Sequence, residues 1–405
     1  MNCGYIDPQP PKPCPIRTGP KCLRTRYDAL VVGTGPAGSV LAYRLARAGL
    51  NVGVLERGRA QQTGTFPESP GELLSQAQLW RHGRRVGPAD GLFDLRVFDD
   101  LMVLTGCGVG GTSLINASVS VVPDESVMGD RRWPTAIRED PEWPHDFDRV
   151  GSMVGTTPLP DGRRVDKLTA LEAMAEAEEV GGVVQRAPLN VAFEDGFNST
   201  GEYMTACNGC GNCMTGCNVG AKQTYDRNYL YGARRLGASV FARCSVQRVE
   251  ATAHGWAVVV ADTMDPSVQR RVEADQVLLA AGALGSTEIL LRSRAVGLDV
   301  SPMLGQRFSG NGDLIAWGFD TDAHVGSVGV PGDSGDGWLG VGPTITGMIR
   351  GTPKDAAQDD PGVDAWMMQD GTVPVAFARL TPLLIAISAI LDKLPLNEGP
   401  GRIRD

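Results

Sequence analysis

Asp28-Ala-Leu-Val-Val-Gly33-Thr-Gly35-Pro36-Ala37-Gly38-Ser39 joins an apolar run directly to the pattern Gly-x-Gly-x-x-Gly. Residues 29–32 are continuously apolar, which is typical of a parallel strand buried on both faces. Residues 39–48 carry apolar side chains at helical spacing. We therefore expect a strand, a tight glycine turn and a helix in succession, which is the arrangement that binds a dinucleotide.

The three glycines of this pattern have separate physical roles. Gly33 permits the tight turn, Gly35 lets the backbone approach a pyrophosphate, and Gly38 allows the helix to pack closely on the strand. Residues 51–55 predict a second strand that leads into Glu56. A carboxylate at that place can hydrogen-bond both ribose hydroxyls and disfavours a 2′-phosphate, so we expect a dinucleotide other than NADP.

A second glycine-rich stretch, residues 105–117, reads Thr-Gly-Cys-Gly-Val-Gly-Gly-Thr-Ser-Leu-Ile-Asn-Ala. Bare backbone beside short hydroxyl side chains suits a chain that lies against a planar ring or a phosphate. Together with the first pattern, this stretch resembles the first signature of the glucose–methanol–choline (GMC) family of FAD oxidoreductases, with a departure at Ser120. Further blocks match the family in the same order, and the last of them looks most like its cholesterol-oxidase-like branch: residues 132–134, 220–222, 277–291 and 304–313.

The resemblance implies a set of FAD-binding residues. Those for the ADP half are Gly33, Gly35, Gly38 and Glu56, and those toward the pyrophosphate and the isoalloxazine are Gly110, Gly111 and Asn116. Val246 is implied beside the adenine, and Ala281 and Gly282 beside the ribose and adenine. Five neighbours complete the predicted set: Pro36, Ala37, Arg57, Thr112 and Ala117.

Composition limits the classes of function. The chain has 405 residues, of which 42% are hydrophobic, with a formal net charge of −9. This length can bury a large core and favours two structural regions, while the negative charge argues against a nucleic-acid groove and favours a small-molecule partner. No N-terminal stretch has signal-peptide character, so a cytoplasmic location is expected. The apolar run 380–391 contains Pro382 and is too short to cross a bilayer, so we expect a core or cavity-lining helix there.

Four cysteines form a separate pattern. Cys207, Cys210, Cys213 and Cys217 have C-x2-C-x2-C-x3-C spacing, which is that of bacterial ferredoxin cluster ligands. Asn218 stands where ferredoxins have proline, and similar cysteine-rich segments occur in cholesterol-oxidase-like relatives, where the resemblance alone does not imply iron. Three interpretations stay open: an iron–sulfur cluster, a zinc site, and free or paired structural thiols.

The catalytic base cannot be assigned from the sequence. Oxidation of an alcohol by a flavin needs a base for the hydroxyl proton, and the resemblance implies a histidine in a C-terminal His-x-x-Gly-Gly-type segment. The four histidines of this chain are outside such a segment: His82, His145, His254 and His324. We expect surface or satisfied roles for all four. We also expect a truncated copy, a fragment, or one half of a split enzyme that a second polypeptide completes.

The predicted fold is α/β, with a Rossmann-like FAD-binding domain and an incomplete α+β substrate domain that contains an antiparallel sheet. The predicted division is an extended tail at 1–25, FAD-binding parts at 26–143 and 207–310, and substrate-domain segments at 144–206 and 311–405. Residues 257–260 and 272–278 predict a hairpin within the FAD-binding part. The predicted function is FAD-dependent oxidation of an alcohol, with a bulky, sterol-like one as a candidate. The alternatives are a dehydrogenase that passes electrons through a cysteine-bound cluster to a carrier, and an inactive flavin-binding remnant.

Overall fold

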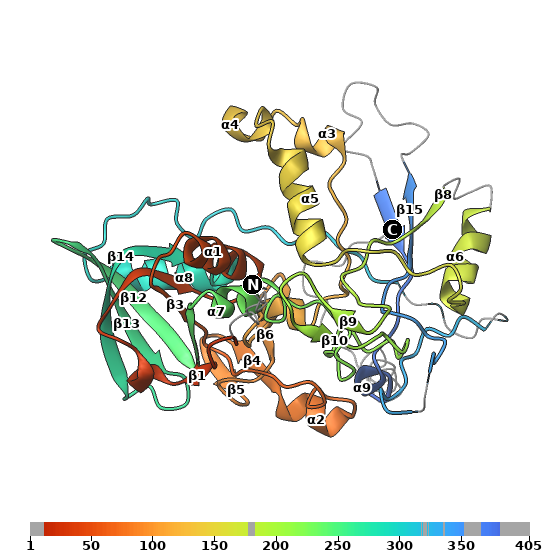
Figure 1. Cartoon of the computed structure of the whole chain (residues 1–405), viewed down its shortest axis with the longest axis horizontal. Helices are drawn as coiled ribbons and strands as arrows, with labels where there is room; N and C mark the ends of the chain where they lie inside the picture. The colour runs from red at the N-terminus through yellow and green to blue at the C-terminus, as the bar shows by residue number, and fades with distance from the viewer. Residues whose placement is uncertain are drawn as a thin grey trace, which may run out of the picture.

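A seven-stranded sheet forms the centre of the larger structural region in the computed structural model (Figure 1). The structure describes residues 12–176, 183–316, 318, 322, 324–334, 337–351 and 366–380. The strand order is β1-β11-β3-β2-β14-β13-β12. Neighbours from β1 to β14 are parallel, whereas β14, β13 and β12 pair antiparallel. The strands are β1 (Arg17–Thr18), β2 (Arg26–Val32), β3 (Val52–Leu55), β11 (Ser239–Ala242), β12 (Cys244–Thr252), β13 (Gly255–Asp262) and β14 (Gln269–Leu279).

Helices cover both faces of this sheet. On one face, α1 (Pro36–Arg47) packs beside α7 (Tyr229–Arg235), and their alanines and leucine join Val31 and Val54 in one buried cluster. On the other face, α8 (Gly282–Arg294) packs on β12, and Ile289 joins a cluster with Leu30 and Leu55. Because both faces are covered, β2 and β3 need apolar side chains at nearly every position, which is what their sequences provide.

The elements predicted around the first glycine pattern are confirmed. The strands expected at 29–32 and 51–55 fall on β2 and β3, and the expected hairpin is the antiparallel pair β13–β14. The helix expected at 39–48 begins earlier, at Pro36, which suits the first helical position because its fixed φ matches a helix.

Part of the segment predicted as an extended tail, residues 1–25, joins the large sheet. Arg17–Thr18 are extended, but they form β1, which pairs in parallel with β11 at the edge of the sheet. A short 3-10 helix, η1 (Pro20–Cys22), follows. The free edge of β11 offers backbone partners to any extended chain beside it, and composition alone does not reveal such pairing.

A four-stranded sheet, in the order β5-β4-β6-β7, lies next to the large sheet. Ser69 and Glu72 form a capping box at the start of the helix that precedes it. Asp90, which is buried, and Arg243 form an ion pair that connects this region to the start of β12. The elements are α2 (Pro70–Ser75), β4 (Ala77–Arg81), β5 (Arg84–Val86), β6 (Phe93–Val97), β7 (Met102–Gly106) and the 3-10 helix η2 (Gly111–Leu114).

The remaining described segments form a second region, at the top and right of Figure 1. Its three-stranded antiparallel sheet joins β8 (Val183–Arg186) to β15 (Gly347–Gly351) and β16 (Trp366–Gln369), so the segments 144–206 and 311–405 contribute to one sheet. The other elements are α3 (Glu125–Met128), α4 (Thr135–Arg138), α5 (Trp143–Met153), α6 (Asp166–Ala175), β9 (Gly196–Phe197), β10 (Tyr203–Met204) and α9 (Val375–Ala378).

None of the helices in the described part of the chain is both long enough and apolar enough to cross a membrane. The apolar run predicted as a core helix at 380–391 lies outside the described residues, apart from Leu380 itself. Leu380 packs against a buried cluster that contains Phe93 and Ala376.

Candidate cofactor site

A cavity of about 1200 Å³ runs along the carboxyl ends of β2 and β3 and the N-terminal ends of α1 and α8. This is where dinucleotides bind in open α/β sheets. Eleven of the residues predicted to bind a cofactor line it: Gly33, Gly35, Pro36, Ala37, Glu56, Arg57, Gly111, Thr112, Val246, Ala281 and Gly282. Residues that are more than 200 positions apart in the sequence therefore share one wall.

Four predicted residues do not line this cavity: Gly38, Gly110, Asn116 and Ala117. Gly38 instead serves close packing, because a β-carbon there would lie 2.0 Å from the carbonyl oxygen of Gly33. Gly110 has φ +113°, and a β-carbon there would lie 2.8 Å from the buried Oδ1 atom of Asp226. Asn116 contributes its backbone carbonyl to a buried contact with Lys222, as described below.

The two glycine loops, residues 33–38 and 105–117, touch each other. A β-carbon at Gly111, whose φ is +60°, would lie 2.6 Å from the α-carbon of Gly35. The turn itself needs Gly33, which has φ +99° and lies so close to Ala280 that a β-carbon would come within 2.3 Å of its carbonyl oxygen. The absence of side chains at these places lets three backbone segments meet beneath the cavity.

Glu56 lies at the end of β3 with only 8% of its surface exposed. Its Oε2 accepts hydrogen bonds from the Thr34 hydroxyl at 2.6 Å and the Thr34 N–H at 3.1 Å, and its Oε1 accepts one from the Gly58 N–H at 2.8 Å. A carboxylate has about four acceptor positions. Three are occupied by the protein, so Glu56 is fixed in orientation and has about one position left for a ligand.

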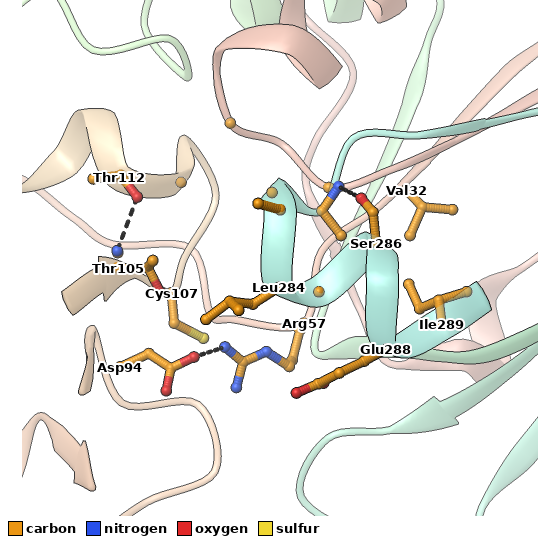
Figure 2. Close-up of a pocket in the computed structure, with 18 of the residues that line it drawn as sticks. Val32, Arg57, Asp94, Thr105, Cys107, Thr112, Leu284, Ser286, Glu288 and Ile289 are labelled. Atoms are coloured by element: carbon orange, nitrogen blue, oxygen red, sulfur yellow. Dashed lines mark hydrogen bonds and ion pairs between the residues drawn. The ribbon is translucent and has the colours of Figure 1, made fainter. Parts of the chain in front are cut away.

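A charged wall faces the helix α8 across the cavity (Figure 2). Arg57 donates to Oδ2 of Asp94 at 2.6 Å and to Oε1 of Gln78 at 3.0 Å. Arg96 forms ion pairs with Asp94 and with Glu288 of α8, and its guanidinium stacks over the ring of Trp80 at 5.5 Å. Since Oδ1 of Asp94 has no hydrogen-bond partner among the described residues, the wall offers a buried acceptor next to two guanidinium groups.

None of the four histidines is placed to act as a catalytic base in the cavity. All four histidines are exposed, and none of them lines the cavity, which agrees with the surface roles expected for them. Burial raises the pKa of Cys107 to about 12, so this thiol in the second glycine loop stays neutral. Cys107 thus acts as a small packing residue and not as a nucleophile.

One buried ammonium joins the second glycine loop to the cysteine loop, residues 207–217. Lys222 is 2% exposed, and its Nζ donates to the carbonyl oxygens of Leu114 at 3.1 Å, Asn116 at 2.7 Å and Cys213 at 2.9 Å. Burial lowers the pKa of Lys222 to about 8. The three carbonyls satisfy all three of its donors, which is the usual requirement for burying a charged group.

The cysteine loop surrounds a second, much smaller cavity of about 20 Å³, which all four of its thiols line. The volume is enough for about one water molecule. None of the thiols is in a disulfide, and burial, followed by the neighbouring thiol of Cys213, raises the pKa of Cys210 to about 12. Among the described residues, no group of three or more histidine, cysteine or acidic side chains is arranged to hold a single metal ion. This geometry gives the zinc interpretation no support.

Sequence reasoning missed several residues of the site. Thr34 occupies a variable position of the glycine pattern, and Asp94 and Arg96 belong to β6, a strand that carries no motif. Only the buried lysine had a signal, because the resemblance already pointed to residues 220–222. The others meet the cavity through tertiary contacts that span 22 to 192 positions.

The family profile covers the part of the chain that forms most of this cavity. A sequence profile described as GMC oxidoreductase matches residues 27–310. The chain is 30% identical to a cholesterol oxidase of Acinetobacter baumannii, covering 74% of this chain and 57% of that protein. It is 26% identical to the long-chain-alcohol oxidase FAO3 of Arabidopsis thaliana, covering 89% and 45%. Among solved structures, pyridoxine 4-oxidase from "Mesorbium loti" matches with a TM-score of 0.42 and 20% identity over 66% of this chain and 51% of that one. The chain spans about half the length of these relatives, and it belongs to the GMC oxidoreductase family.

Proposed function

We propose that this chain binds FAD in the large cavity and takes part in oxidising the CH–OH group of an alcohol. The observation that carries the proposal is that both glycine loops, Glu56 and the start of α8 line one cavity of about 1200 Å³. Membership of the GMC family implies FAD. The whole cavity, and not the first glycine pattern alone, is what supports a dinucleotide here.

The residues of the cavity fit a dinucleotide. No side chain caps the N-terminus of α1 at Gly35, and nothing lies within 4 Å of where a β-carbon of Gly35 would be. The first N–H groups of the helix and its dipole are therefore accessible to a phosphate. Glu56 stands at the end of β3, the place from which an acid reaches a ribose, and Arg57 adds positive charge beside it.

Bound FAD supplies a two-electron acceptor, so that a CH–OH group gives up a hydride to it and a proton to a base, and becomes a carbonyl. The chain's own part in this reaction is binding and orientation. Lys222 donates a hydrogen bond to the Asn116 carbonyl of the second glycine loop, and Gly111 of the same loop lies against Gly35. These contacts fix the position of the loop backbone beside the cavity. Since no histidine lines the cavity among the described residues, a base contributed by a second polypeptide is one candidate for the proton acceptor.

The proposed substrate class is a bulky, apolar alcohol. The relatives that support it are named cholesterol oxidase and long-chain-alcohol oxidase. We extend to this chain only what those names share, a large apolar alcohol.

The test begins with an absorption spectrum of the purified chain before and after addition of FAD. Flavin bands that stay with the protein through gel filtration support the cofactor site, and a chain that never takes up FAD contradicts it. An anaerobic mixture with a long-chain alcohol, a sterol and a matched alkane then tests the reaction. Bleaching by the alcohols alone supports oxidation. Binding without bleaching favours a flavin-binding protein that is inactive or is completed by another polypeptide.

A second candidate function is a flavin dehydrogenase that passes electrons through a cysteine-bound iron–sulfur cluster to a carrier. Its basis is the cysteine spacing in the sequence, since the cavity that these cysteines line holds about one water molecule and no group of the described residues is arranged to hold a metal ion. Iron and acid-labile sulfide are measured after anaerobic reconstitution, with the chain carrying Cys213→Ser as the control. Iron and sulfide in equal amounts that the control lacks would support the cluster. Their absence from the unaltered chain leaves structural thiols as the interpretation.

A further inference from the structure

Thr34 lies between the first two glycines of the pattern and is completely buried. Its hydroxyl oxygen is 2.6 Å from Oε2 of Glu56, 3.2 Å from the carbonyl oxygen of Gly108 and 3.0 Å from the N–H of Gly110. Its own N–H donates to the same Oε2 of Glu56 at 3.1 Å. One small side chain therefore contacts both the acid at the end of β3 and the second glycine loop.

The chemistry of these contacts gives the hydroxyl a defined arrangement. A hydroxyl has one proton to donate, and the short contact to the charged Glu56 carboxylate is the stronger of the two acceptor contacts. The oxygen lone pairs then accept the Gly110 N–H. The hydroxyl thus connects a donor of the second glycine loop to the carboxylate.

Both connected groups matter at the cavity. Glu56 lines it directly, and Gly110 precedes Gly111, the residue that lies against Gly35. If the hydroxyl is removed, the Gly110 N–H loses its acceptor and Oε2 of Glu56 loses one of its donors. Both losses occur at a completely buried side chain. A buried polar group without a partner costs free energy, so both groups would shift to find new partners.

We propose that Thr34 is a positioning residue of the cofactor site: its hydroxyl fixes the orientation of the Glu56 carboxylate and ties the second glycine loop to the first. The binding readout of this inference rests on the proposed FAD function. The second readout, which is the protection of the Gly110 N–H from hydrogen exchange, does not depend on that function. Among the small side chains, only serine and threonine supply an aliphatic hydroxyl.

Two substitutions separate the hydroxyl from the shape of the side chain. Thr34→Val keeps the shape and removes the hydroxyl, and Thr34→Ser keeps the hydroxyl. Ser293→Ala is the matched control, because Ser293 is also completely buried, accepts from the Val249 N–H at 2.9 Å, donates to the Ile289 carbonyl at 2.8 Å and does not line the cavity.

The first measurement is a titration of each purified variant with FAD, in which flavin fluorescence reports binding. We expect Thr34→Val to bind about tenfold more weakly than the unaltered chain, which is the effect of one lost bond to a buried charge. Thr34→Ser should stay within about twofold, and Ser293→Ala should keep its affinity although it loses a similar hydroxyl. Equal affinity of Thr34→Val and the unaltered chain would overturn the inference, as would a serine variant that is as weak as the valine one.

The second measurement is hydrogen exchange of the backbone amides without FAD. We expect the Gly110 amide to exchange faster in Thr34→Val than in the unaltered chain and in Thr34→Ser, while amides of β12 stay as they are. If the unaltered chain binds no FAD, the proposed function fails but the exchange experiment still decides the inference. Unchanged exchange at Gly110 in the valine variant would then overturn it.

Discussion

The Nζ atom of Lys222 lies 2.7 Å from the carbonyl oxygen of Asn116 and 2.9 Å from that of Cys213. The second glycine loop and the cysteine loop are therefore held by the same buried ammonium. A long side chain that ends in three donors suits this role because it reaches two loops at once, and no neutral side chain of that length can replace its three bonds.

Replacing this ammonium should loosen both loops. We expect Lys222→Met to lower the free energy of unfolding by about 3 kcal/mol, since three buried carbonyl groups lose a charged donor while the chain length stays similar. Urea unfolding followed by far-UV circular dichroism measures the change. Lys21→Met, at an exposed site, is the control and should change the free energy by less than about 0.5 kcal/mol. A Lys222→Met chain as stable as the control would show that the ammonium contributes nothing net.

The acid at the end of β3 gives a prediction for cofactor affinity. Glu56→Ala removes the carboxylate that faces the cavity and also the acceptor for Thr34 and Gly58. We expect FAD binding at least tenfold weaker, because hydrogen bonds to a charged group contribute about 1.5–3 kcal/mol each. Fluorescence titration measures the affinity. Asp28→Ala, whose carboxylate instead accepts the Asn51 N–H at 2.7 Å, is a matched control outside the cavity. Equal losses in both variants would assign the effect to stability and not to a contact with the cofactor.

Buried thiols should make the chain lose stability in alkali. Burial is the main cause that raises the pKa of Cys244 from 9.0 to about 12, and the Asp262 carboxylate adds to it. Because the folded pKa is the higher one, the unfolded chain releases its proton first, and the stability present below about pH 9 is lost as the pH rises toward 12. Each such thiol contributes a loss of up to about 1.4 kcal/mol per pH unit in that window.

The measurement is urea unfolding at pH 8 and pH 10. We expect the loss of stability between these two pH values to be smaller for Cys244→Ala than for the unaltered chain. The exposed Cys22, changed to alanine, is the control. A Cys244→Ala chain that loses as much stability between pH 8 and pH 10 as the unaltered chain would contradict the assignment.

The part of the site that the sequence predicts is the part made by local pattern. Gly33, Gly35 and Glu56 occupy places that a strand, a turn and the next strand dictate, and all three line the cavity. The charged wall could not be predicted, because Asp94 meets Arg57 only after a separate sheet has formed and docked. Asn116 shows the opposite limit. The resemblance implies a place beside the flavin, whereas in the structure its carbonyl accepts from Lys222 and its side-chain Oδ1 accepts from the Ser118 N–H, and the contact with a flavin stays a prediction.

The fold shows the same division. The long apolar runs predict β2, β3 and β14, since strands buried on both faces have few polar positions. Arg17–Thr18 carries no such pattern and joins the sheet through backbone bonds to β11, which any two residues can make. The four-stranded sheet is equally hidden, because its cavity face carries Gln78, Asp94 and Arg96 where a core strand would have apolar residues.

The contact between the two glycine loops gives the sharpest steric prediction. Gly111→Ala adds a β-carbon that would lie 2.6 Å from the α-carbon of Gly35, at a residue whose φ is +60°. Backbone on both sides leaves no flexible neighbour to move, so we expect the loops to separate and FAD binding to fall below detection. Gly49→Ala is the matched control, because Gly49 has φ +85° and nothing within 4 Å of an added β-carbon. Gly49→Ala is destabilised by about 1–2 kcal/mol because alanine disfavours a left-handed conformation, but its new β-carbon makes no close contact. FAD titration of both variants separates the two effects: affinity lost in Gly111→Ala alone identifies the meeting of the loops as the cause, and equal losses would assign it to backbone strain.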